Sequence, residues 1–441
     1  MRHTSRWTGR TRVVVAVATM SAITLAACGD DEPEENNDAA EGGPVDLTMW
    51  VAREQYIPPD SFFDSLEEAY PDINLTVELQ PDDALFFQMQ RMKQAGEALP
   101  DLVQVDSFFA APMYELGLAI DLTDVVEQWQ EEDPELYDLQ ADPVFFEHDD
   151  AIVGLATTGS MDVLYVRSDW LTEAGVEVPI DTWDGVLDAL RAIKQNHPDI
   201  FPWAMIATRG EGVNWLISQM VASGVEFDGA IPQLTSEAGE YVISFYQQLI
   251  RDELTSPEAL AWGENESRGT WIGGRAAMIL DGMRSSNDIG DALTDGLGVT
   301  YPDGWQMILL PHSRSGEPEE GEQLVATRTF HITSDSEHPY EASLVMRHLT
   351  ETDQAIEAAK SGAVYLQNEV MSSPEFAEIY PYADEPIRQA LLEAGSFPSA
   401  SYFFEVVDLL EQMVQDILQN PDADPAELAE KWQEQLDALA G

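Results

Sequence analysis

The chain has 441 residues, of which 44% are hydrophobic and eleven are tryptophans, and this is enough for two packed domains. Its 21 basic and 82 acidic side chains give a formal net charge of −61 at pH 7. Because phosphate binding requires a basic face, this charge argues against nucleic acid as a partner.

Residues 1–27 have the pattern of a secretory signal peptide. Arginines precede an apolar run from Val13 to Ala27, which is shorter than the roughly 20 apolar residues of a membrane-spanning helix. The only cysteine, Cys28, follows Leu25-Ala26-Ala27 directly. This order resembles the bacterial lipobox, and the resemblance implies lipidation of Cys28 and an anchor on the extracellular face of the cell membrane. The alternative is cleavage after Ala27 that leaves a free thiol.

Residues 28–44 contain almost no apolar side chains and are predicted to be a disordered tether. A flexible chain of this length covers about 20 to 25 Å. The many carboxylates and four lysines resemble the surface of proteins from salt-loving organisms, where salt screens self-repulsion. Calcium binding is the alternative, but the acidic residues are spread along the chain and do not gather in loops.

The folded part begins with alternating segments of strand and helix character. Strands are expected at 47–51, 75–79 and 102–105, with helices after residue 60 and over 86–93. This order is typical of a parallel sheet covered by helices on both faces. Further strands are expected at 152–155, 163–166, 276–280, 305–310 and 324–332, and further helices at 181–196, 213–223, 236–254, 339–349, 402–418 and 426–439.

The sequence has no nucleophile elbow, phosphate loop or His-Glu-x-x-His motif, and its seven histidines lack the spacing of metal ligands. We therefore expect no enzyme activity, no metal and no cofactor. Several tryptophans and phenylalanines lie in or near expected loops. Their flat faces suit the C–H faces of sugars, and packing in the core is the alternative for each of them.

Short stretches along the mature chain carry a resemblance to a known family. They are Leu47–Trp50, Phe63–Glu78, Leu99–Val103, Leu116–Thr123, Val163–Trp170, Thr182–Asp184, Arg275–Gly282, Pro339–Ala342 and Leu349–Thr350. In order and spacing they resemble the extracellular solute-binding proteins of ABC importers, in the sugar-binding family of maltose-binding-protein type. The resemblance implies a monomer that delivers a sugar or oligosaccharide to the transmembrane subunits of a permease.

The resemblance also implies an α/β fold of the periplasmic-binding-protein-like type II, with two lobes, a hinge and a ligand cleft between the lobes. The first lobe is expected to comprise residues 45–155 and 329–380, and the second lobe residues 156–328 and 381–441. The ligand contacts it implies are Trp50, Arg53, Glu54, Asp106, Ser107, Thr158, Arg209, Glu211, Asn214, Trp215, Asp281, Arg284, Arg328, Phe397, Tyr402 and Phe403.

This chain departs from the family pattern after Asp281-Gly282, where many relatives have a tryptophan and Met283-Arg284 stands here. Four arginines fall near the expected cleft, and they are Arg53, Arg209, Arg284 and Arg328. They favour an anionic polyol or an organic acid as the alternative ligand, unless each arginine forms an ion pair with a neighbouring carboxylate. A secreted glycan-active enzyme is the remaining alternative.

Overall fold

The computed structural model describes residues 43–52, 60–80, 85–134, 145–148, 151–209, 212–316, 321–359, 364 and 366–439. The predicted signal peptide, Cys28 and nearly all of the predicted tether lie outside these residues. By their contacts, the residues from Gly43 onward group into one compact unit, so the boundary between two lobes stays a prediction. None of the described helices is long and apolar enough to cross a bilayer.

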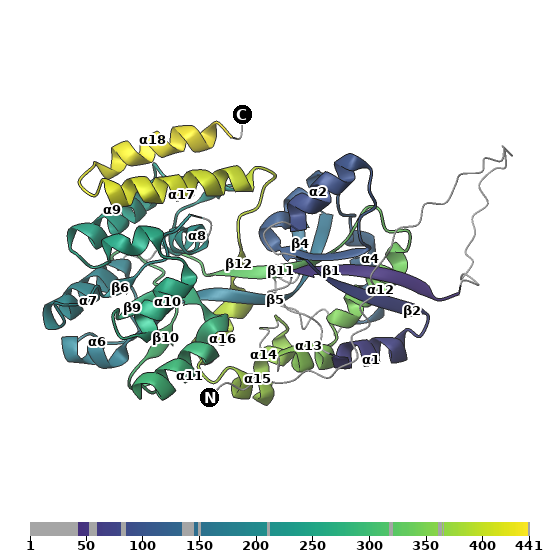
Figure 1. The fold of residues 1–441 in the computed structure, drawn as a ribbon, viewed down its shortest axis with the longest axis horizontal. Helices are drawn as coiled ribbons and strands as arrows, with labels where there is room; N and C mark the ends of the chain where they lie inside the picture. The colour runs from purple at the N-terminus through teal and green to yellow at the C-terminus, as the bar shows by residue number, and fades with distance from the viewer. Residues whose placement is uncertain are drawn as a thin grey trace. The chain divides into compact units, whose positions relative to one another are not determined.

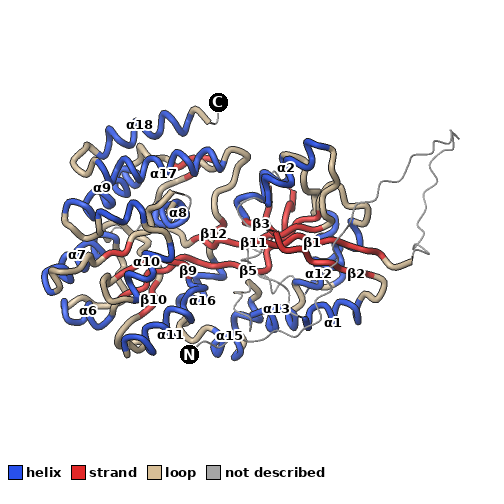
Figure 2. The backbone as a smooth tube through the Cα atoms, in the orientation of Figure 1, coloured by secondary structure: helices blue, strands red, loops and turns tan. Residues whose placement is uncertain are grey.

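One mixed sheet runs through this unit with the strand order β2-β1-β3-β11-β5-β9-β6 (Figures 1 and 2). Its strands are β1 (Val45–Ala52), β2 (Ile73–Gln80), β3 (Leu102–Asp106), β4 (Phe145–His148), β5 (Ala151–Val166), β6 (Trp203–Ala204), β9 (Met278–Gly282), β10 (Gln306–Ile308), β11 (Leu324–Ile332) and β12 (Gly395–Ser396). A separate two-stranded sheet consists of β7 (Phe227–Asp228) and β8 (Ile231–Pro232).

The start of the sheet has the expected parallel order. Strand β1 pairs in parallel with β2 and with β3. Strand β11 then runs antiparallel to both β3 and β5, so the sheet as a whole is mixed.

Strand β5 differs from its prediction, because residues 151–166 form one strand of 16 residues and not two short ones. Its polar middle interrupts the apolar pattern, but β11 supplies partners there, with Arg328 opposite Thr158 and Ala326 opposite Ser160. The beginning of β5 pairs with β4, and its end pairs with β9 and β10. Pairing with β11 thus keeps the polar middle extended, and the other three strands hold the two ends of β5.

Helices cover both faces of the sheet (Figure 1). In the first part of the chain they are α1 (Asp60–Ala69), α2 (Leu85–Ala95), the short 3₁₀ helix η2 (Ser107–Phe109), α3 (Ala110–Glu115), α4 (Thr123–Glu132), α6 (Ser168–Ala174), α7 (Trp183–Asn196), α8 (Val213–Ala222) and α9 (Glu237–Arg251). The later helices are η4 (Pro257–Ala261), α10 (Glu264–Ile272), η5 (Met283–Ser285), α11 (Ser286–Leu297), α12 (Pro339–Leu349), α13 (Thr352–Ala359), α14 (Asn368–Ser372), α15 (Pro374–Ile379), α16 (Glu385–Glu393), α17 (Phe403–Gln419) and α18 (Pro425–Asp437).

Strand β5 separates two apolar cores, because successive side chains of a strand point to opposite faces. Leu164 and Val166 belong to the core formed with α7, α8, α9, α17 and α18. Met161, Val163 and Tyr165 belong to the core on the other face, which includes residues of α10, α11 and α12. A side chain on β5 is therefore assigned to one layer or the other by its position in the alternation.

Candidate functional site

A row of polar side chains lies on one face of β5. Thr158, Ser160 and Asp162 occupy alternate positions on the strand, and the alternation continues to Leu164 in the first core. Thr158 is buried, whereas Ser160 and Asp162 keep partial solvent exposure. We call the surface formed by Thr158, Ser160 and Asp162 the polar floor, since it interrupts an otherwise apolar face next to solvent.

Arg328 and Asp106 extend the polar floor across two further strands. Arg328 on β11 lies opposite Thr158 on one side and opposite Asp106, at the end of β3, on the other. Its Nη1 atom is 2.8 Å from Oδ2 of Asp106, and both side chains are about one fifth exposed. The fold thus brings three of the predicted ligand residues together, and the charge of Arg328 is balanced by a carboxylate.

Ser107 follows Asp106 and begins η2. Its side chain is buried, and its Oγ atom has no hydrogen-bond partner among the residues that the structure describes. A buried hydroxyl without a partner is costly, so a ligand or a water molecule beside Ser107 would offset that cost.

Asp162 was missed by sequence reasoning, as were Ser160 and Ser218. The Oγ atom of Ser218, on α8, donates a hydrogen bond of 2.6 Å to Oδ2 of Asp162. Although the residue keeps some exposure, burial raises the pKa of Asp162 to about 7, against the lowering effects of the Ser218 hydrogen bond and the Arg284 charge. The polar floor therefore carries a carboxyl group that changes its charge near neutral pH.

Asp281, another predicted ligand contact, does not lie on the polar floor. It stands opposite Val163 on β5, on the face of the second core, and it is fully buried. Its Oδ2 and Oδ1 atoms accept hydrogen bonds of 2.8 and 3.0 Å from Nε and Nη2 of Arg268, and Arg268 also pairs with Glu264. This arrangement gives Asp281 a structural partner inside the protein.

A cluster of six phenylalanines joins segments that are far apart in the sequence. We call it the phenylalanine cluster, and it consists of Phe86 and Phe87 of α2, Phe108 and Phe109 of η2, and Phe403 and Phe404 of α17. The ring of Phe403 stacks on that of Phe108 at 5.3 Å and is only 1% exposed. Phe403 is thus occupied by protein contacts in this conformation.

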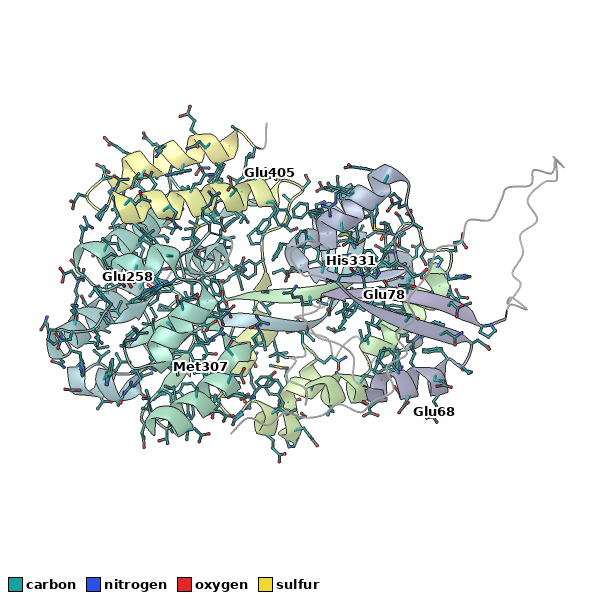
Figure 3. All side chains as sticks on the ribbon, in the orientation of Figure 1. Glu68, Glu78, Glu258, Met307, His331 and Glu405 are labelled. Atoms are coloured by element: carbon teal, nitrogen blue, oxygen red, sulfur yellow. The ribbon has the colours of Figure 1, made fainter. Side chains whose placement is uncertain are left out.

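The remaining predicted contacts lie in varied surroundings. Trp50 is buried and donates a 2.9 Å hydrogen bond from Nε1 to Oε2 of Glu78, which Figure 3 labels on β2. Arg209 is exposed and pairs with Asp408, with Glu411 3.7 Å away. Trp215, near the start of α8, is partly buried, as is its neighbour Asn214, while Phe397 is buried in the first core and Tyr402 packs against that core. Arg53, Glu54 and Glu211 lie outside the described residues.

Arg284 is the fourth arginine that was predicted to lie near the ligand. It is exposed, and within the described part of the chain its guanidinium forms no ion pair shorter than 4.0 Å. Over the same residues, no cluster of three or more His, Cys, Asp or Glu side chains could hold a metal ion. Hydroxyls, carboxylates and one exposed guanidinium are groups that suit a ligand rich in hydroxyls.

Comparisons with known proteins identify the family of this chain. A family model described as bacterial extracellular solute-binding protein matches residues 52–356. A search of curated protein sequences finds no match.

Several solved structures have a similar fold, and this chain matches nearly the whole length of each. A cyclic alpha-maltosyl-1,6-maltose binding protein from Arthrobacter globiformis has a TM-score of 0.72 and 17% identity over 90% of this chain and 99% of its own. A sugar-binding protein from Xanthomonas citri has a TM-score of 0.73 and 15% identity over 90% and 97%. A solute-binding protein of an ABC transporter from Thermotoga lettingae, bound with alpha-D-tagatose, has a TM-score of 0.70 and 20% identity over 90% and 100%.

Proposed function

Because this chain belongs to the bacterial extracellular solute-binding proteins, we propose that it captures a neutral sugar or oligosaccharide and delivers it to the permease of an ABC importer. The polar floor is the observation that carries the proposal, since it offers hydroxyl and carboxylate groups beside solvent at the junction of β3, β11 and β5. Similar folds with bound tagatose and ribitol support a polyhydroxylated ligand.

The charges near the polar floor favour a neutral ligand over an anionic one. Arg328, on this surface, is paired with Asp106. Arg209, another of the arginines predicted to contact the ligand, is paired with Asp408 of α17 and lies near Glu411. An anionic ligand would have to compete with these carboxylates for the guanidinium groups. The exposed guanidinium of Arg284 is the observation that keeps an anionic polyol or organic acid as a second candidate.

We further propose the two-lobe division, with residues 45–155 and 329–380 in one lobe and residues 156–328 and 381–441 in the other. Strands β5 and β11 would then be two of the connections, since each pairs with β3 or β4 near one end and with β9, β10 or β12 near the other. A ligand that contacts both lobes favours the closed form, and closure is the change a permease can recognise. The protein would act as a monomer and without catalysis.

A thermal-shift screen tests the ligand class. We expect neutral sugars or sugar alcohols to raise the melting temperature more than uronates or glycerol phosphates, because a ligand at 100 times its dissociation constant stabilises the fold by about 2.7 kcal/mol. Shifts by anionic compounds alone would contradict the neutral-ligand proposal. The alternative of a glycan-active enzyme is tested by incubating the protein with oligosaccharides and analysing the products. Cleaved products would support that alternative.

The proposed lipid anchor at Cys28 has its own test. We expect the Cys28→Ser variant of the full chain, expressed in a bacterial host, to move from the membrane fraction to the soluble extracellular fraction, because the thiol that carries the lipid is lost. Purified protein that starts at residue 29 should bind ligand as tightly as the anchored form. A variant that stays with the membrane would contradict lipidation at this residue.

A further inference from the structure

Gly282 lies close against the polar floor, although its backbone conformation does not require a glycine. Its φ of −69° and ψ of 138° lie in a region that every residue type can adopt. A Cβ atom at this position would lie 3.0 Å from Oγ of Ser160 and 4.0 Å from both Oδ1 of Asp162 and Cγ of Arg284. The absence of a side chain therefore lets the backbone of β9 approach the Ser160 hydroxyl, with the Asp162 carboxylate and the Arg284 side chain beside it.

The three side chains around Gly282 are complementary in hydrogen bonding. Asp162 accepts from Ser218, which fixes one carboxylate oxygen, and its other oxygen faces Gly282. Arg284 offers donors, and Ser160 offers both a donor and an acceptor. A sugar ring with adjacent hydroxyls needs this mixture of donors and acceptors.

The charges around Asp162 oppose an anion. The charged groups that act on Asp162 are Asp281 of β9, Glu264 of α10 and Arg284 after β9, and its own strand contributes the neutral phenol of Tyr165. Arg268 is shared by Asp281 and Glu264, so these three groups carry one net negative charge. Among the described charges that act on Asp162, Arg284 is the one that balances it, and little positive potential remains for an anionic ligand.

We propose that Ser160, Asp162, Gly282 and Arg284 form a subsite that selects neutral, hydroxyl-bearing rings, with Asp162 as the residue that rejects anionic ones. The inference rests on the proposed function, because it assumes that the polar floor binds the ligand. Rejection is by repulsion: a ligand carboxylate at Arg284 would lie near ionised Asp162. Without that negative charge, Arg284 would attract the same ligand.

Matched pairs of sugars test this selection. We would measure binding of glucose with glucuronate and of galactose with galacturonate by calorimetry at pH 8, in wild type and in Asp162→Asn. Wild type should prefer the neutral member of each pair. In the variant the ratio of neutral to anionic affinity should fall at least tenfold, which is about 1.4 kcal/mol. As a control, Asp252→Asn removes a surface carboxylate that pairs with Arg191, and it should leave the ratio unchanged.

Two further measurements separate charge from shape. In wild type the preference for the neutral sugar should weaken between pH 8 and pH 6, as Asp162 takes up a proton, whereas Asp162→Asn should show no such change. Gly282→Ala should weaken the binding of neutral sugars about tenfold, because the added methyl group would crowd the Ser160 hydroxyl and displace it. Gly296→Ala, at a position on α11 with no atom within 4 Å of the added Cβ, should not.

The outcomes distinguish a failure of the proposed function from a failure of the proposed subsite. If neither these sugars nor any neutral sugar or sugar alcohol of the thermal-shift screen binds to wild type, the proposed function is contradicted. If sugars bind and Asp162→Asn leaves the ratio unchanged, the subsite is contradicted and the proposed function stands. A readout without ligand is the titration of Asp162 by carboxyl ¹³C NMR, which should move to higher pH in Arg284→Gln. An unchanged midpoint would refute the charge balance whether or not a sugar binds.

Discussion

Replacing Asp281 by alanine is expected to lower the free energy of unfolding by about 3 kcal/mol. The Asp281 carboxylate is fully buried and accepts two hydrogen bonds from the Arg268 guanidinium and one of 2.8 Å from the amide of Gly282. Its loss leaves Arg268, whose side chain is 19% exposed, with Glu264 as the remaining partner. We place the loss at the low end for a broken buried pair, because Glu264 still offsets part of the charge.

Chemical denaturation of wild type and variant measures this loss. Asp252→Ala is the matched control, since it breaks an ion pair whose two side chains are each 36% exposed, and it should cost less than about 1 kcal/mol. Equal losses for the two variants would contradict a structural role for Asp281. Ligand affinity of the folded Asp281→Asn variant then tells whether Asp281 also acts on the ligand through Gly282, its neighbour in the proposed subsite.

Much of the fold could be predicted from the sequence, because hydrophobic periodicity and the residues that begin or end helices and strands are local signals. Strand β11 and helix α12 have the expected bounds, 324–332 and 339–349. Helix α18 lies where a helix was expected, and Asp424 caps it by accepting a hydrogen bond from the amide of Ala426. The family match and the solved folds confirm the type II α/β architecture. Strand β5 was divided in two because its continuity depends on β11, which comes some 170 residues later in the chain.

The candidate site was harder to predict, because a position at a strand end does not reveal which face the side chain occupies. Asp106 and Arg328 were expected near the ligand, and the fold places them in contact on the polar floor. Asp281 was expected beside them, but it points to the opposite face of the sheet. Asp162 was overlooked because the expected strand began at Val163, although its two-residue spacing from Ser160 and Leu164 was a usable signal.

The second large effect is a loss of stability at low pH, and it concerns His331 on β11, which is labelled in Figure 3. This residue lies at the junction of β3, β11 and β5. The ring is fully buried, and Nδ1 lies 2.6 Å from the carbonyl oxygen of Val153, so Nδ1 carries the proton and donates it. Nε2 then accepts from the Thr329 hydroxyl at 2.8 Å. A Cβ on Gly154 would approach the ring to 2.6 Å, so the backbone of β5 closes the remaining side.

Burial lowers the pKa of His331 to about 4, and the hydrogen bond to Val153 only partly opposes this. A histidine in the unfolded chain has a pKa of about 6.5. The unfolded state therefore binds a proton between pH 6.5 and pH 4 that the folded state does not bind, so stability is present above this range and is lost as the pH falls through it. The loss should reach about 3 kcal/mol at pH 4.

Other groups also titrate in this range, above all the many carboxylates, so the informative quantity is the difference between variants. We expect the unfolding free energy of His331→Gln to fall by about 3 kcal/mol less than that of wild type between pH 7 and pH 4. His338→Gln, at a site whose side chain is 43% exposed, is the control for replacing a histidine outside this junction. Parallel curves for wild type and His331→Gln would contradict the prediction.

NMR titration of the wild-type histidines tests the same prediction even if the variant folds poorly, since the His331 ring should stay neutral down to about pH 4. A neutral ring at this junction keeps β3, β11 and β5 joined without a buried charge, which is the condition under which a rigid floor can present polar groups to a ligand.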